Sequence, residues 1–173
     1  PATSNQQPAT SNQQPATRYN ISMQSIEALF ADYASFHQTA GNKLFHRLGI
    51  PMIVLSLIGM LTQVTLVDVG TVRFDAAMLL IAASSAYYFV AEWRLALAMI
   101  AISIAFYFIG GVIPFWINVA LFVLGWIFQF IGHKAYEHKN PAFFRNFVHL
   151  LIGPLWILND VVPVVKTKVA GRP

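Results

Sequence analysis

The sequence predicts an all-α fold: an integral membrane bundle of four short transmembrane helices, preceded by an amphipathic helix and followed by a broken helical stretch that is re-entrant or interfacial. The first evidence is composition, because 57% of the 173 residues are hydrophobic and only 10% are charged, against about a quarter charged in soluble domains. The second is a series of four apolar segments with almost no charge inside them. Core helices of a soluble protein are the alternative, but so small a chain could hardly enclose four of them.

The first 22 residues are interpreted as a disordered tail or linker. The heptapeptide PATSNQQ occurs twice and then begins a third time, without any apolar side chain larger than alanine. Such a segment cannot bury enough apolar surface to fold. The folded part is expected to start near Met23.

A histidine-bearing amphipathic segment is expected over residues 23–49. Apolar side chains recur at three- and four-residue intervals from Ser25 to Leu48, a pattern typical of a helix lying against a membrane surface. Gly41–Asn42 is expected to interrupt this helix. The Gly49-Ile50-Pro51 sequence is expected to end it and to start the first span.

Four transmembrane helices are expected within residues 50–131. Their predicted bounds are about Ile50–Val67, Ala76–Ala91, Leu95–Gly110 and Ile113–Ile131. Each is shorter than the roughly 20 residues that a span usually needs. Short spans suggest a thin membrane or helix ends that stand in the interface.

The last region, residues 132–173, is expected to hold a second histidine motif and a membrane-associated segment. This segment runs from about Phe143 to Val165 and contains Gly153-Pro154 and Pro163. These breaks predict two half-helices that dip into the membrane and return, or that lie in its interface. A full span is the alternative.

The positively charged residues predict the orientation of the bundle. Arg73 falls on the far side of the predicted spans, whereas the near side holds Lys43, Arg47, Arg94, Lys134, Lys139 and Arg145. By the positive-inside rule, the near face is cytoplasmic. The protein is therefore expected in a bacterial inner membrane, or in the endoplasmic reticulum membrane of a eukaryote.

Composition also excludes several kinds of site. The chain has no cysteine, which removes disulfides, thiolate metal sites and cysteine nucleophiles together. It has no long run of lysine or arginine, so no nucleic-acid partner is expected. The lipid bilayer is the expected partner, and the oligomeric state is left open.

The histidines carry the strongest functional signal. All five lie before the first predicted span or after the fourth: His37, His46, His133, His138 and His149. An even number of spans brings both groups to the same membrane face. We therefore predict a histidine cluster on the cytoplasmic face, with ordinary interfacial polar residues as the alternative.

Spacing indicates which side chains could share a metal ion. His133 and Glu137 are four residues apart and so share a helical face, as do Asn42 and His46. His37 and His46 are nine apart and diverge on a straight helix, so both can bind one ion only if the helix breaks between them. Imidazoles with a carboxylate suit iron(II), zinc or manganese.

Other polar residues near the cluster have candidate roles in supporting the metal or the substrate. Tyr33, Asn42 and Gln129 could orient the metal ligands. The nearby cations are expected to set topology, or alternatively to hold a substrate carboxylate: Lys43, Arg47, Lys134 and Arg145. His138 and His149 are interpreted as ordinary polar residues. Asp160 is a costly charge in an apolar stretch, and both a functional role and a place at a helix end stay open for it.

Two segments resemble the yeast-type 2-hydroxy fatty acid dioxygenase family of small membrane proteins. They are YASFHQTAGNKLFHRLGIP, from Tyr33 to Pro51, and QFIGHKAYEHKNPAFF, from Gln129 to Phe144. The resemblance implies an iron(II)-dependent dioxygenase that cleaves the C1–C2 bond of a 2-hydroxy fatty acid with O2, giving CO2 and an acid one carbon shorter. It covers nearly the whole chain from Met23 onward.

The resemblance also implies the site residues. His37, His46, His133 and Glu137 match motif positions and are the predicted metal ligands, one of them outside the first coordination shell or leaving it when substrate binds. Tyr33 and Asn42 are predicted catalytic residues. Apart from the resemblance, Lys43, Arg47 and Lys134 are the candidates for binding the substrate carboxylate. The acyl chain would lie among the spans while its head group reaches the metal.

Two other classes of function stay open. A zinc-dependent membrane lipid hydrolase could use the same ligands to hold a metal-bound water. A non-enzymatic scaffold or small transporter is less favoured, because transport needs polar groups inside the spans. Asn118 and Gln129 are the main polar residues there.

Overall fold

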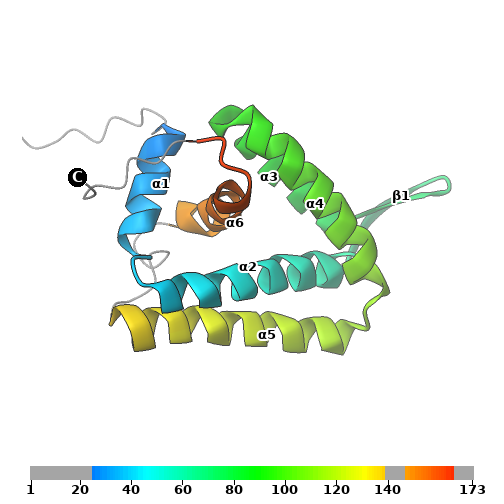
Figure 1. Ribbon diagram of the computed structural model, residues 1–173. Coiled ribbons are helices and arrows are strands. Elements are labelled where there is room, and N and C mark those ends of the chain that lie inside the picture. Colours follow the sequence, from blue (N-terminus) through cyan, green and yellow to red (C-terminus); the bar gives the residue numbers. More distant parts are fainter. Residues whose placement is uncertain (1–24, 139–146, 166–173) are drawn as a thin grey trace, which may run out of the picture.

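A computed structural model describes residues 25–138 and 147–165, and it is mainly helical (Figure 1). The predicted tail and its boundary at Met23 lie outside the described residues. In chain order the elements are α1 (Ile26–Ser35), α2 (Ala40–Leu61), β1 (Thr65–Val69), β2 (Val72–Asp75), α3 (Ala76–Ala91), α4 (Trp93–Val112), α5 (Phe115–Ile131), the π-helical turn η1 (Gly132–Glu137) and α6 (Val148–Val161).

Three helices of the described part are long and apolar enough to cross a membrane, by length and composition: Ala40–Leu61, Trp93–Val112 and Phe115–Glu137. Helix α3 has the bounds expected for the second span, but with 16 residues it is shorter than these three. At a rise of about 1.5 Å per residue it falls short of the roughly 30 Å hydrocarbon layer. Of the four predicted spans, three therefore have helices of spanning length.

Helix α2 differs from the prediction at both ends. It begins at Ala40 and runs through Gly49 and Pro51 without a break, so Gly49-Ile50-Pro51 does not separate an interfacial helix from a span. Proline removes one backbone donor and tends to bend a helix, but apolar helices packed on neighbours often keep it. The predicted amphipathic helix is instead divided between α1 and the first turns of α2.

The segment after α2 forms a β-hairpin, so the prediction of an all-helical chain is wrong here. Strands β1 and β2 pair antiparallel, with Asp68 opposite Arg73 and Val69 opposite Val72. The strands are rich in β-branched residues, which favour extended backbone, and Gly70 adopts the left-handed conformation that the tight turn requires (φ 62°). The predicted first span therefore stops at Leu61 rather than at Val67.

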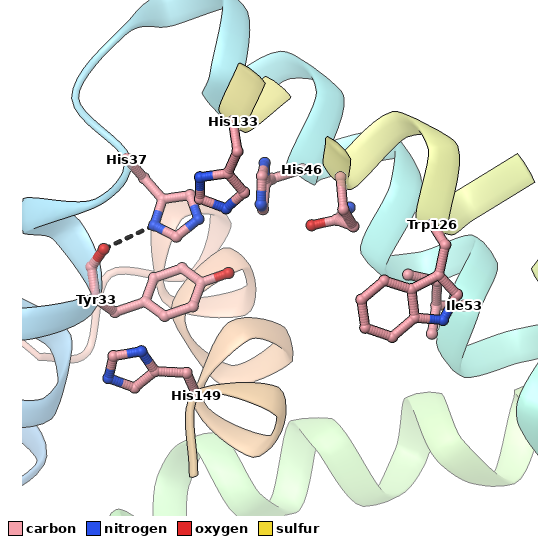
Figure 2. A pocket seen from close by; sticks show the side chains of 8 residues that line it. Tyr33, His37, His46, Ile53, Trp126, His133 and His149 are labelled. Atoms are coloured by element: carbon pink, nitrogen blue, oxygen red, sulfur yellow. Dashed lines mark hydrogen bonds between the residues drawn. The ribbon is translucent and has the colours of Figure 1, made fainter. Parts of the chain in front are cut away.

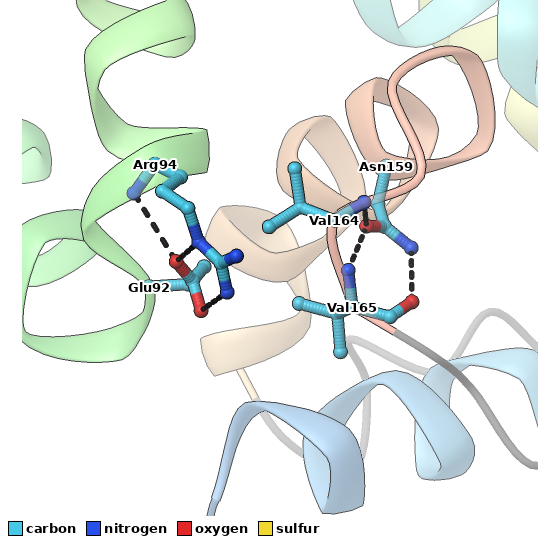
Figure 3. Close-up of polar contacts among 5 residues, drawn as sticks. All are labelled: Glu92, Arg94, Asn159, Val164 and Val165. Atoms are coloured by element: carbon cyan, nitrogen blue, oxygen red, sulfur yellow. Dashed lines mark hydrogen bonds and ion pairs between the residues drawn. The ribbon is translucent and has the colours of Figure 1, made fainter.

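Glu92 makes the sharp turn between α3 and α4. Its extended backbone ends one helix and begins the next. Its carboxylate accepts hydrogen bonds from the Arg94 backbone N–H at 3.2 Å and from Arg94 Nε at 2.9 Å (Figure 3). A charged cap at a helix N-terminus is favourable, because the first turn leaves backbone donors unpaired.

Helix α6 is continuous, so the predicted break at Gly153-Pro154 is wrong. Pro154 lies inside a 14-residue helix, which is too short to cross the hydrocarbon layer. The chain turns back after Val161, and the Asn159 side chain closes this turn. Its Oδ1 accepts from the N–H groups of Val164 and Val165 at 3.0 and 2.8 Å, and its Nδ2 donates to the Val165 carbonyl at 3.0 Å (Figure 3).

The packing of the helices brings the beginning and the end of the segment from α2 to α5 together at one end of the bundle. Helices α2 and α5 lie side by side, and the start of α2 lies next to the end of α5 (Figure 1). Helices α1 and α6 pack together at this end, while the hairpin projects from the other (Figure 1). A core of α1, α4 and α6 residues, including Phe30, Leu95, Ile152 and Leu155, fixes α1 and α6 to the rest of the molecule.

Candidate metal centre

Three histidines from separate segments meet inside the end of the bundle where α2 begins. His37 comes from the connection between α1 and α2, His46 from α2, and His133 from the π-helical turn after α5. Their ring centroids are 4.3 to 4.8 Å apart (Figure 2). One potential ligand atom of each lies within 4.8 Å of the others, and each side chain is at most 2% exposed.

The break that lets His37 and His46 converge lies between α1 and α2. Helix α1 ends at Ser35 and Thr39 caps the start of α2, so the interruption precedes the predicted position at Gly41–Asn42. Glu137 holds this connection in place, because its Oε1 accepts from the backbone N–H groups of Gln38 and Thr39 at 2.6 and 2.7 Å. The carboxylate therefore replaces the helical hydrogen bonds that the break removes.

Backbone carbonyls orient two of the three rings. The Tyr33 carbonyl lies 2.6 Å from His37 Nδ1, and the Asn42 carbonyl lies 2.9 Å from His46 Nδ1. A carbonyl only accepts hydrogen bonds, so each Nδ1 carries the proton and each Nε2 keeps a free lone pair. This arrangement of the second ring nitrogen is common among metal-binding histidines.

The buried ring nitrogens fit a metal ion. His37 Nε2 and His133 Nδ1 are buried and have no hydrogen-bond partner among the described residues. The pKa of His37 is lowered to about 2, mainly because the ring is buried and to a lesser extent because His46 lies beside it. The His37 ring is therefore neutral at physiological pH. Neutral imidazoles with open lone pairs suit iron(II), zinc and other borderline cations.

Gly132 provides the space in which α5 approaches α2. A Cβ at this position would lie 2.5 Å from Asn42 Oδ1 and 3.1 Å from His46 Nδ1. Real Cβ atoms do not approach oxygen that closely, so only glycine fits between His133 and its neighbours without a shift of the α2 side chains. The close packing of α5 on α2 thus explains why the residue before His133 is a glycine.

A small cavity of about 50 Å³ lies beside the three histidines. Its lining residues are Tyr33, His37, His46, Ile53, Trp126, Gln129, His133 and His149. The histidines and Tyr33 lie at one side, and Ile53 and Trp126 lie at the other (Figure 2). The cavity therefore has a polar side at the candidate metal centre and an apolar side towards the middle of α2 and α5.

The predicted catalytic residues lie next to the cluster. The Tyr33 ring stacks on His37, with centroids 4.0 Å apart and planes 11° apart. Burial raises the pKa of Tyr33, so its hydroxyl stays protonated. Asn42 is buried, and its Nδ2 donates to the Phe36 carbonyl at 3.0 Å and to Glu137 at 3.3 Å.

Glu137 lies near the histidines, close enough for its charge to interact with His46 and His133. The candidate metal group in the described structure consists of the three histidines. The Glu137 carboxylate accepts hydrogen bonds from Gln38, Thr39 and Asn42. Its assignment as a ligand stays a prediction.

The three predicted carboxylate-binding cations do not line the cavity. Arg47 pairs with Asp160, its Nε donating at 2.9 Å, so Asp160 has an ion-pair partner near the end of α6. Lys43 is half-buried and Lys134 is exposed. None of these cations is among the cavity-lining residues.

Sequence reasoning missed three residues that line the cavity: Ile53, Trp126 and His149. Ile53 follows His46 by seven residues and Trp126 precedes His133 by seven, which puts each on the same helical face as its histidine and could have identified both. His149 Nε2 lies 2.8 Å from Asp32 Oδ2, and its ring packs edge-on against Tyr33 at 5.8 Å. This contact joins α1 to α6, and no sequence spacing predicts it.

Fold and site together define a class: helical proteins with candidate membrane spans and a buried histidine cluster that could bind a metal ion at one end of the bundle. A family model described as 2-hydroxy-palmitic acid dioxygenase Mpo1-like matches residues 23–163, so the chain belongs to this family. It is also similar to 2-hydroxy-palmitic acid dioxygenase MPO1 of Saccharomyces cerevisiae, with 26% identity over 127 residues that cover 73% of each chain. No solved structure matches the chain. The resemblance seen in the sequence is thus confirmed at the level of the family.

Proposed function

We propose that the protein is an iron(II)-dependent dioxygenase that cleaves the C1–C2 bond of 2-hydroxy fatty acids. A 2-hydroxy acid and O2 would give a fatty acid one carbon shorter, CO2 and water, which balances all atoms. The observation that carries this proposal is the buried group of His37, His46 and His133, in which His37 Nε2 and His133 Nδ1 have no hydrogen-bond partner among the described residues. Family membership and the printed activity of the yeast relative support the reaction type.

His37, His46 and His133 are the proposed metal ligands. A bound iron(II) ion would supply the redox chemistry with O2 that the side chains of this chain lack. The Tyr33 and Asn42 carbonyls hold the rings of His37 and His46 in the metal-binding tautomer. The Tyr33 ring covers His37 and keeps water from that side of the centre.

Of the four predicted ligands, Glu137 is the one that we propose lies outside the first coordination shell. Four donors already approach its Oε1, from Gln38, Thr39 and Asn42. A carboxylate that is fixed in this way supports the loop carrying His37 and the turn carrying His133. We propose that Glu137 positions these ligands, as carboxylates beside metal sites commonly do.

The apolar side of the cavity is the proposed place where the acyl chain begins. Ile53 and Trp126 extend the site from the histidines towards the apolar middle of α2 and α5. The head group would then reach the metal while the chain stays in an apolar medium. The metal face is proposed to be cytoplasmic, in a bacterial inner membrane or the endoplasmic reticulum. Lys43 and Lys134 stay candidates for the substrate carboxylate outside the cavity, since neither lines it.

One observation favours a second function, a zinc-dependent membrane lipid hydrolase. Three histidines without a carboxylate are a known catalytic zinc set, whereas many iron(II) oxygenases use two histidines and one carboxylate. The family supports the dioxygenase instead. Metal identity and oxygen consumption separate the two functions.

The first experiment is oxygen uptake by purified protein that has been loaded anaerobically with iron(II) and given 2-hydroxypalmitate. We expect uptake, with a C15 acid as the product, and loss of both in His133→Ala. Zinc-loaded protein given the same substrate is the matched control and should consume no oxygen. No uptake by the iron-loaded protein, together with tightly bound zinc, would overturn the dioxygenase and favour the hydrolase.

A further inference from the structure

Gln129 has a buried amide side chain that lines the cavity but takes no part in the proposed metal binding. It lies near the end of α5, four residues before His133 of the η1 turn that continues this helix. Its side chain lines the cavity beside the three histidines and is only 6% exposed. Its Nε2 has no hydrogen-bond partner among the described residues.

An amide in this position is costly unless something pairs with it. A buried donor that stays unpaired loses the hydrogen bonds it makes with water in the unfolded chain and gains none in return. The helix opposite leaves room for the amide, because Gly49 of α2 has no side chain there and a Cβ on Gly49 would overlap Gln129 Nε2. Helices α2 and α5 therefore leave room for the Gln129 amide but give its Nε2 no hydrogen-bond partner among the described residues. This is typical of a group that binds a ligand.

The position of Gln129 along the cavity indicates which part of a ligand it meets. His133 lies one turn further along the chain, in the η1 turn that follows α5, and Trp126 lies almost one turn back, at the apolar side (Figure 2). Gln129 is thus at the boundary between the candidate metal centre and the apolar end. In a 2-hydroxy fatty acid, this boundary is carbon 2, where the head group joins the chain.

The chemistry of the amide suits a hydroxyl better than a carboxylate. No lysine or arginine of the described residues lines the cavity, so a carboxylate there would depend on the metal for its countercharge. A glutamine amide has an NH2 group that donates and a carbonyl oxygen that accepts, and a hydroxyl likewise donates and accepts. This match holds whichever way the amide is turned.

We propose that Gln129 binds the 2-hydroxyl group of the substrate and so distinguishes 2-hydroxy fatty acids from unsubstituted ones. The inference rests on the proposed function and adds to it a residue that determines specificity. A site built to pair with a hydroxyl discriminates against the analogue that lacks it, because its own polar group is then left buried and unpaired. Gln129 needs no part in the redox step.

The test compares binding of 2-hydroxypalmitate and palmitate to anaerobic iron(II)-loaded protein, by displacement of a fluorescent fatty acid. Wild-type protein should prefer 2-hydroxypalmitate. Gln129→Met, which keeps the volume and removes the amide, should reduce this preference by about tenfold, with the palmitate Kd and the metal content unchanged. In oxygen uptake, the same variant should raise KM more than it lowers kcat. Gln129→Leu serves as a second variant if the methionine lowers the folded yield.

Asn118→Ala is the matched control, because Asn118 is a buried amide on the same helix that does not line the cavity. Its Nδ2 donates to the Gly110 carbonyl at 2.9 Å, so the variant should lower stability and leave the preference unchanged. An unchanged preference in both Gln129 variants, or equal weakening of both ligands, would overturn the role of Gln129. If wild-type protein consumes oxygen in that case, only this inference fails. If wild-type protein shows neither uptake nor preference, the proposed function fails as well.

Discussion

At the scale of single residues, the site depends on groups that hold the histidines as much as on the histidines themselves. Glu137 fixes the connection that carries His37, and Gly132 lets the turn that carries His133 approach α2. Both residues lie within a few residues of His133 in the sequence, yet their roles are different. One provides hydrogen bonds and the other provides space.

Glu137→Ala should weaken metal binding without removing a proposed ligand. The backbone N–H groups of Gln38 and Thr39 lose their acceptor, so the His37 loop becomes less ordered. Loss of such a supporting carboxylate typically costs about 10- to 100-fold in metal affinity, measurable by competition with a chromophoric chelator. Glu27→Gln on the exposed side of α1 is the control and should bind as wild type does. Complete loss of binding, equal to that of His133→Ala, would instead mark Glu137 as a ligand.

Gly132→Ala should disturb the centre through packing alone. The added Cβ would lie 2.5 Å from Asn42 Oδ1, so Asn42 and His46 must move, and we expect lower metal affinity and a lower melting temperature. Gly111→Ala in α4 is the matched control, since its Cβ would meet Thr62 at an ordinary 3.6 Å. That control should be neutral or stabilise by up to about 1 kcal/mol, as helical glycine-to-alanine changes do. Equal metal affinity in Gly132→Ala and wild type would contradict the packing argument.

At the scale of elements, the sequence predicts the bounds of a helix best where polar capping residues mark both of its ends. Helix α3 has the predicted bounds, because Asp75 caps its start and Glu92 ends it. The apolar residues of β1 continue the hydrophobicity of α2, so the sequence pattern extends the predicted first span to Val67 and does not separate the strand from the helix. Pro51 and Pro154 predict helix breaks, but packing against neighbouring helices keeps both helices intact.

Asp75 joins the hairpin to the bundle, and its replacement should affect the fold without affecting the metal centre. Its Oδ1 caps α3 by accepting from the Met78 N–H at 2.9 Å, and its Oδ2 accepts from the Tyr107 hydroxyl of α4 at 2.6 Å. Asp75→Ala should therefore destabilise the protein by about 1–2 kcal/mol, mainly through the lost cap, as seen in a lower melting temperature. Asp75→Asn, which can still accept at Oδ1, should lose less. Metal affinity should stay as in wild type for both, and a loss of affinity would show that the two ends of the bundle are coupled.

At the scale of the whole molecule, the position of the site follows from how the chain returns. Helices α2 and α5 lie side by side with the start of one beside the end of the other, so His46 and His133 meet although they are far apart in the sequence (Figure 1). The prediction that both histidine groups lie at one end follows from the even number of predicted spans between them, which returns the chain to the end where it started. The packing of α1 against α6, through Asp32 and His149, depends on tertiary contacts that leave no periodic signal in the sequence.

Metal binding should stabilise the end of the bundle more than the molecule as a whole. The three histidines come from the α1–α2 connection, from α2 and from the turn after α5, so one ion would tie these segments together. A ligand that binds only the folded state at about 1,000 times its Kd adds about 4 kcal/mol of stability. Removal of the metal with a chelator should therefore lower the melting temperature and speed amide hydrogen exchange in α1 (Ile26–Ser35), while exchange in the hairpin changes little. His133→Ala should already show the fast exchange and no response to chelator. Equal exchange in α1 with and without metal would contradict a shared ion at this end, because an ion bound by one segment alone would leave the packing of α1 unchanged.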